Sequence, residues 1–231
     1  MLEPFVTWKL QRERKRLLQS LPDNPLRNFL QAPLPDVGKS IMETGILALD
    51  LETTGLDPNS DEIIAVGFVP IDQMVIRLAG AQHILVRPVG KVQESAAAIH
   101  GILESHLREA EPLQAIFPRI LQALQGRVLL AHHAKMELTF LNAACRTLYN
   151  GTLPIRTIDT LLLEKRRLQR QGKILQHGDL RLATCRQRRS LPRYKAHDAL
   201  LDAIACGELF LTQAKHAGNP TNTPLKDFLI L

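Results

Sequence analysis

The period of the apolar positions changes along the chain, which predicts strands first and then a mixture of helices and strands. Four apolar runs bounded by turn residues are typical of strands, at residues 46–51, 62–72, 83–88 and 128–133. Apolar residues at a spacing near 3.6 predict helices at residues 112–126, 134–148, 157–170, 180–187 and 196–217. This order predicts an α/β fold in which a mixed sheet carries helices on both sides.

The first 45 residues differ from the rest, and we interpret them as an N-terminal extension. Residues 12–21 have helical character, and prolines then recur at positions 22, 25, 33 and 35. Prolines at this density argue against a continuous packed element. The regular pattern predicts one domain over residues 46–217, followed by a C-terminal tail at 218–231. Either end could dock on a partner or pack on its own domain.

Composition narrows the class of protein. The chain has 231 residues, of which 45% are hydrophobic, so it can bury a substantial core. Three widely spaced cysteines indicate neither a disulfide framework nor a zinc site and fit a reducing compartment. We find no apolar run long enough for a membrane span and no signal peptide, and therefore expect a cytoplasmic protein with no membrane partner.

Positive charge is concentrated in one segment of the chain. The formal net charge is +6, but residues 156–195 hold 12 Lys or Arg against 3 acids, a net +9. Such clustering indicates a polyanionic partner such as nucleic acid. The alternative is a solvated basic surface on ordinary helices.

Two carboxylates end the first apolar run. Asp50 and Glu52 are separated by one residue, and strand side chains alternate, so both acids point to the same face. Removing a carboxylate from water costs several kcal/mol, which a bound cation with hard oxygen ligands, such as Mg²⁺ or Mn²⁺, would offset. The alternative is that one acid caps the next turn and the other is solvated.

Later segments supply further candidates. His197 and Asp202 lie five residues apart in the last predicted helix, so both side chains can reach one pocket. Glu137 falls one turn inside the helix that follows the strand at 128–133, where it can point back toward the sheet edge. Taken singly, each residue also fits an exposed position without a task.

In this order the acids resemble the DnaQ-like 3′→5′ exonucleases of the DEDDh class, such as the exonuclease domain of bacterial DNA polymerase III epsilon. The resemblance covers residues 46–215 and rests on four segments: DLETTGLD at 50–57, AAAIHGI at 96–102, Asp159-Thr160, and AHDALLDAIACGELF at 196–210. It implies an RNase H-like α/β fold with a mixed five-stranded sheet, in which an antiparallel meander precedes parallel strands, flanked by helices.

The resemblance also implies a two-metal hydrolysis that releases nucleoside 5′-monophosphates from single-stranded DNA or RNA 3′ ends. Two divalent cations, Mg²⁺ or Mn²⁺, would be held by Asp50, Glu52, Glu137 and Asp202, and His197 would be the general base. The terminal nucleotide would contact Thr53, Thr54, Gly55, Leu56 and His100. A polymerase or another protein is a further expected partner.

One motif departs from the family pattern. The family usually has His-Asn-Ala-x-Phe-Asp where this chain has His132-His133-Ala134-Lys135-Met136-Glu137. Glu137 keeps the carboxylate but adds a methylene, and coronaviral proofreading exoribonucleases are similar in this respect. Adjacent strand residues point apart, so we expect at most one of His132 and His133 near the site. The alternative function is a non-catalytic nucleic-acid-binding or partner subunit that keeps the fold.

Overall fold

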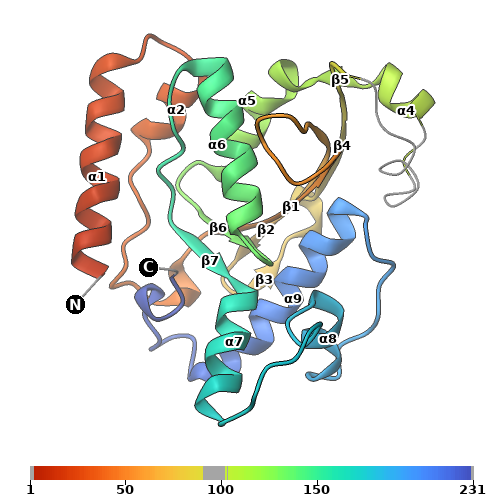
Figure 1. The fold of residues 1–231 in the computed structure, drawn as a ribbon. Helices are drawn as coiled ribbons and strands as arrows, with labels where there is room; N and C mark the ends of the chain where they lie inside the picture. Colours follow the sequence, from red (N-terminus) through yellow and green to blue (C-terminus); the bar gives the residue numbers. More distant parts are fainter. Residues whose placement is uncertain (1–2, 91–101, 103, 230–231) are drawn as a thin grey trace.

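The computed structural model describes residues 3–90, 102 and 104–229. Their strands form one mixed sheet in the order β5-β4-β2-β1-β6-β7, with β3 paired beside β2 (Figure 1). The strands are β1 (Ile46–Thr53), β2 (Ile63–Asp72), β3 (Val75–Ile76), β4 (Gln82–Arg87), β5 (Glu111–Pro112), β6 (Val128–Ala131) and β7 (Thr157–Asp159).

The sheet confirms the predicted mixture of antiparallel and parallel pairing. Strands β1, β2 and β4 form the antiparallel meander, and β6 and β7 then continue the sheet in parallel with β1. The described sheet has seven strands, whereas we expected five. Two of them, β3 and β5, are only two residues long, which is too short for an alternating pattern to reveal.

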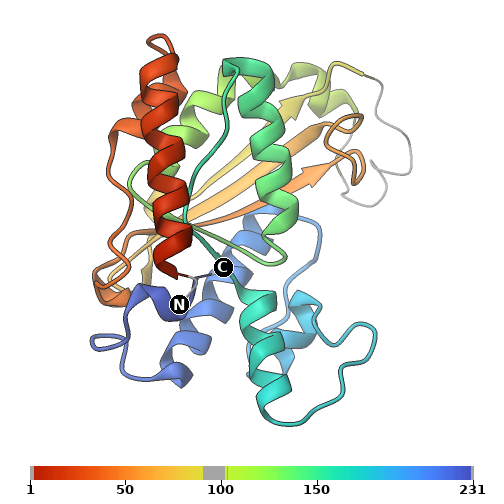
Figure 2. The same ribbon diagram turned by 60° about the vertical axis from the view of Figure 1, so that its left-hand side comes forward.

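Helices cover both faces of the sheet (Figures 1 and 2). They are α1 (Glu3–Ser20), α2 (Pro25–Gln31), α4 (Glu104–Glu109), α5 (Leu113–Leu124), α6 (Lys135–Tyr149), α7 (Thr160–Arg170), α8 (Leu182–Gln187) and α9 (Ala199–Ala217), with short 3₁₀ turns η1 (Ile41–Glu43), η2 (Leu78–Gly80) and η3 (Leu225–Asp227). Among the described residues, no helix combines the length and apolar character that a membrane span requires.

The helices expected at residues 157–170 and 196–217 begin later than predicted, and an N-cap aspartate explains both differences. Thr157–Asp159 pairs with β6 as a strand, and the Asp159 side chain then caps α7 by accepting the N–H group of Leu161. In the last helix the cap is Asp198, whose side chain accepts the N–H group of Leu201, so α9 begins at Ala199. An N-cap aspartate has extended backbone geometry, and this places the helix boundary after it.

The N-terminal segment packs on the domain in spite of its prolines. Pro25 occupies the first turn of α2, where a proline is well tolerated because its missing N–H group would have no helical partner. The prolines therefore delimit two helices instead of preventing their packing. Apolar side chains of α1, of α2 and of the segment between them enter the core that α5, α6 and one face of β1 share: Leu17, Leu21, Leu26, Phe29 and Leu30.

The alternation within β1 separates two cores and positions the acids. Leu47 and Leu49 face the core that contains α5 and α6, whereas Ile46 and Ala48 face the core that contains α9. Continuation of this period of two places Asp50 and Glu52 on the face that α9 covers. The acids therefore lie between the sheet and the last helix.

Candidate active site

A glycine in the neighbouring strand brings α9 against the acids. Gly67 of β2 is the register partner of Asp50. A Cβ atom at Gly67 would lie only 2.0 Å from the backbone carbon of Ala199, so the first turn of α9 packs directly on the sheet at this point. Asp202 follows one turn later and thereby reaches the end of β1.

Three carboxylates converge as a result. One oxygen from each of Asp50, Glu52 and Asp202 lies within 4.8 Å of the other two, so these groups could hold a metal ion. Glu137 lies outside this triplet but is electrostatically coupled to Asp50 and Glu52. Its side chain is buried in the first turn of α6. The structure thus assembles the four acids that the sequence indicated, three of them more closely than the fourth.

Burial and mutual repulsion raise the pKa of these carboxylates. Burial raises the pKa of Asp50 well above its ordinary value, and the charges of Glu137, Glu52 and Asp202 raise it further. Burial also raises the pKa of Glu52 to about 7 and that of Glu137 to about 8. The pKa of Asp202 is raised in the same direction, again mainly by burial. Each raised pKa reflects the free-energy cost of keeping that carboxylate charged when no cation is bound.

The donor set fits a hard divalent cation. Glu137 Oε2 is buried and finds no hydrogen-bond partner among the described residues. Buried carboxylate oxygens that repel one another are the arrangement that Mg²⁺ or Mn²⁺ stabilises, because oxygen ligands match these ions. The cluster is therefore a candidate metal centre. Glu137 Oε2 could be a ligand there, because it accepts no hydrogen bond from the described protein groups.

His197 borders the cluster from the segment before α9. Its backbone N–H group donates to Asp202 Oδ2 at 2.9 Å, and its φ of 64° lies in the left-handed region. The side chain is exposed and lines two cavities, of about 870 and 200 Å³. We predicted His197 within the helix, but the tight turn before α9 is what carries it to the acids.

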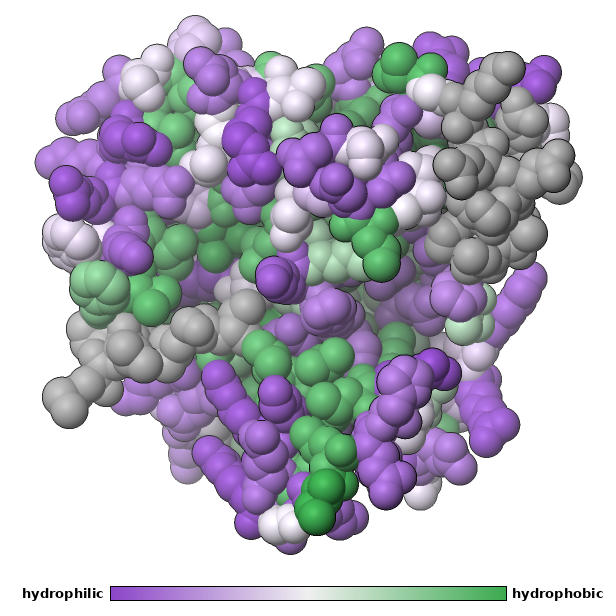
Figure 3. Space-filling view, in the orientation of Figure 1, coloured by the Kyte–Doolittle hydropathy of each residue, from purple (hydrophilic) through white to green (hydrophobic). Residues whose placement is uncertain are grey.

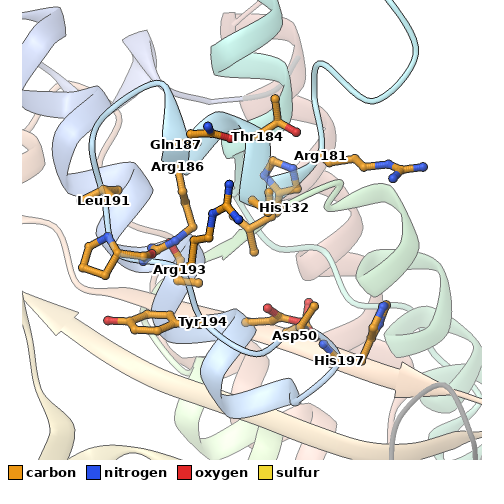
Figure 4. A pocket seen from close by; sticks show the side chains of 16 residues that line it. Asp50, His132, Arg181, Thr184, Arg186, Gln187, Leu191, Arg193, Tyr194 and His197 are labelled. Carbon is orange, nitrogen blue, oxygen red and sulfur yellow. Dashed lines mark hydrogen bonds between the residues drawn. The ribbon is translucent and has the colours of Figure 1, made fainter.

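Figure 4 shows the larger cavity, with Asp50 and His197 along one side and Arg181, Thr184 and Gln187 across from them. His132 also lines it, and its ring nitrogens contact the Thr160 hydroxyl at 2.8 Å and the Leu180 carbonyl at 2.7 Å. His133 is exposed and has a φ of 74°. Of the two adjacent histidines, His132 is therefore the one at the cavity.

The turn after β1 is closed by its own hydrogen bonds. The Thr53 hydroxyl donates to the Gly55 carbonyl at 2.6 Å, and the Thr54 hydroxyl donates to Asp61 Oδ1 at 3.2 Å. A Cβ atom at Gly55 would lie 2.4 Å from the Asp61 carboxylate, so a larger residue there would displace that side chain. Leu56 is left 82% exposed. The threonine side chains thus shape the turn, whereas Leu56 is available for contact.

His100 lies outside the described residues. Ile102, two positions later, lines the cavity of about 200 Å³ together with Glu52, His197 and Lys195. Glu52 places this cavity next to the candidate metal centre, and His197 lines both this cavity and the larger one.

The basic segment at residues 156–195 divides into buried and accessible cations. Arg156 is buried and donates to the Pro35 carbonyl, and Arg186 is buried with N–H groups directed to the Ala205 and Pro192 carbonyls. The guanidinium groups of these two arginines are engaged by protein carbonyls, although Arg186 also lines the larger cavity. Exposed cations that line the two cavities are Arg181, Arg193 and Lys195.

Asp159 is a positioning residue whose full role sequence reasoning missed. Besides capping α7, its two carboxylate oxygens accept the N–H groups of His133 and Ala134, each at 3.0 Å. These bonds fix the turn that starts α6 and so place Glu137. The Asp159-Thr160 pair indicated a helix start. The hydrogen bonds to His133 and Ala134 could not be predicted, because these residues lie 26 and 25 positions earlier in the chain.

Comparisons with known proteins agree with this geometry. Residues 47–210 match the RNase T family model, whose description is "Exonuclease". A PolC-type DNA polymerase III from Thermotoga petrophila is 28% identical over 71% of this chain, and the chain spans about a tenth of that protein, 11%. A DNA polymerase III epsilon subunit from Treponema pallidum is 28% identical over 73% of this chain and 76% of its own length.

A solved structure shares the fold. It is the nuclease domain of 3′hExo, a DEDDh family member, bound to rAMP, with a TM-score of 0.62 and 14% identity. The match covers 75% of this chain and 93% of the other. Such a likeness shows that the mixed sheet and its helices have the expected RNase H-like arrangement.

Proposed function

The chain belongs to the exonuclease family, and on that premise we propose that it is a metal-dependent 3′→5′ exonuclease acting on single-stranded ends. The observation that carries the proposal is the convergence of Asp50, Glu52 and Asp202 within 4.8 Å, with buried Glu137 coupled to them. Its products would be nucleoside 5′-monophosphates. The chain would be a DEDDh enzyme with Glu in the third acidic position.

The four acids would hold two divalent cations, Mg²⁺ or Mn²⁺. When bound, such ions polarise the phosphodiester and stabilise negative charge on the leaving 3′-oxygen. Asp50, Glu52 and Asp202 would contact the cations through the oxygens that face one another. Glu137 would contribute through Oε2, which is buried without a protein partner among the described groups.

His197 would act as the general base. Imidazole exchanges protons near neutral pH, and this side chain lies exposed at the border of both cavities. It would take a proton from the attacking water as the water oxygen bonds to phosphorus. The bond from phosphorus to the 3′-oxygen breaks in the same displacement. The hydrogen bond from the His197 backbone to Asp202 supports this role, because it ties the base to the acid cluster.

The surroundings would position the terminal nucleotide. Exposed Leu56 would wedge against the last base, and backbone groups of the 53–55 turn, whose threonine hydroxyls are occupied, would read the 3′-hydroxyl. His100 remains a proposed contact of the same nucleotide. Arg181, Arg193 and Lys195 would contact phosphates of the incoming strand, with little dependence on base sequence.

The test is cleavage of matched 3′- and 5′-labelled single-stranded DNA and RNA with Mg²⁺ or Mn²⁺. We expect a ladder that shortens from the 3′ end, disappears with EDTA and is absent for Asp50→Ala. Asp23→Ala, which removes an exposed acid outside the site, should cleave normally. Comparison of the two sugars also tells which nucleic acid is preferred.

A non-catalytic role is the alternative outcome. If no substrate is cleaved while binding persists, the fold serves as a nucleic-acid-binding or partner subunit, and Glu137 marks the loss of activity. The polymerase relatives suggest a polymerase as the protein partner for either role.

A further inference from the structure

Helix α1 presents one outward face that combines aromatic rings and cations. Phe5, Trp8, Lys9, Arg12, Lys15 and Arg16 recur at spacings of three and four residues, which places them on one side of the helix. We name this surface the α1 strip. The buried residues of α1 that pack against the domain, Leu17 and Arg14, occupy the opposite side. Figure 1 shows α1 at the outer edge of the molecule, apart from α8, which lines the large cavity.

The rings of the α1 strip are unusually exposed. Phe5 is 54% exposed and Trp8 51%, and the two rings stack with their centroids 6.2 Å apart. Lys9 lies over the Phe5 ring and Arg12 over the Trp8 ring, each 5.1 Å from the ring centroid. Large aromatic surface held next to cations in this way is typical of a binding surface and not of a merely solvated helix.

Cations outnumber acids among the α1 side chains that the structure describes. Among the α1 side chains whose positions are described, Glu13 is the single acid, and it accepts a hydrogen bond from the Thr152 hydroxyl. Lys9, Arg12, Lys15 and Arg16 therefore form a surface of four positive charges beside two rings, and hydrophilic side chains dominate the view over α1 in Figure 3.

We propose that the α1 strip is a second binding surface for single-stranded nucleic acid, separate from the reaction site. Phosphates complement the four cations, and every base offers a face that can stack on Trp8 or Phe5 without regard to sequence. The proposal rests on the proposed function only for the choice of ligand. A strand held by α1 and by the catalytic cavity would bind more tightly than either contact alone allows.

The test measures binding and not cleavage, so that the two proposals fail separately. All variants carry Asp50→Ala and are assayed in EDTA by fluorescence anisotropy. One labelled oligonucleotide has about 30 nucleotides, longer than the 4–16 nucleotides of typical single-strand sites, and another has about 4 nucleotides. Trp8→Ala should weaken binding of the long strand about tenfold and leave the short strand unaffected.

Charge removal gives an independent measure. The triple variant Lys9→Ala, Arg12→Ala, Lys15→Ala should reduce the slope of log affinity against log salt by about 2 for the long strand, since each phosphate contact contributes about 0.7. The matched control removes three exposed cations elsewhere, by Arg77→Ala, Lys215→Ala and Lys226→Ala, and should keep the slope. Circular dichroism checks that both triple variants are folded.

The proposal is overturned if the α1 variants bind the long strand with the affinity and salt slope of the control. It is also overturned if they lose binding to vesicles of anionic lipid while nucleic-acid binding is intact, because the α1 strip would then contact a membrane surface.

Discussion

The acid cluster predicts that Glu137→Gln makes the metal-free protein more stable at alkaline pH. Burial raises the pKa of Glu137 from 4.5 to about 8. The folded protein therefore retains a proton between these pH values that the unfolded chain releases, so the free energy of unfolding falls as pH rises through this window. Above about pH 8 the wild-type protein carries the full cost of a buried charge.

The magnitude follows from the pKa. Each pH unit is worth about 1.4 kcal/mol, so the charged Glu137 costs about 5 kcal/mol at pH 9 at most. Gln fits the same space without charge, but its buried amide lacks partners and costs about 1–3 kcal/mol. We expect a net gain of roughly 2–4 kcal/mol at about pH 9 and, because the amide cost does not depend on pH, a net loss of up to about 2 kcal/mol at about pH 5. For a chain of this size the gain raises Tm by roughly 5–15 °C.

The assay measures the free energy of unfolding by urea in EDTA at both pH values. The control is Glu43→Gln, which makes the same change at an exposed position in η1 and should leave the stability unchanged. The Glu137→Gln variant should lose exonuclease activity and gain less stability than wild type when Mg²⁺ is added. The reasoning is refuted if the variant is no more stable than wild type at pH 9, or if its advantage is equally large at pH 5.

Three other substitutions test separate parts of the structure. Gly67→Ala should destabilise the protein by about 3 kcal/mol and abolish cleavage, because a Cβ atom 2.0 Å from Ala199 must displace the start of α9; urea unfolding and the 3′-label assay measure both. Leu56→Ala should lower kcat/KM on single strands about tenfold and change Tm little, whereas an unchanged kcat/KM would argue against a wedge role. Arg14→Met should cost roughly 2–4 kcal/mol in urea unfolding, because the buried guanidinium donates to the Pro154, Phe29 and Leu30 carbonyls; a smaller loss would mean that water replaces it.

What the sequence determined by itself is the local geometry. The period of two in β1 is a property of any strand, so Asp50 and Glu52 could be assigned to one face before the fold was known. The same holds for the meander, the long last helix, and the order of the acids along the chain. Each of these features follows from the periodicity of a strand or a helix, which residues close together in the sequence determine.

Only the tertiary structure decided how distant segments meet. Asp202 reaches Asp50 because Gly67 admits the backbone of α9, and Glu137 is held through Asp159, which lies 22 residues later. Arg156 and Arg186 of the basic segment donate hydrogen bonds to the carbonyls of Pro35 and Ala205. No sequence pattern predicts these pairings, because the partners lie far apart along the chain. Whether a charged side chain is buried or exposed depends on which chain segments pack around it, and packing follows from the whole fold rather than from any local pattern.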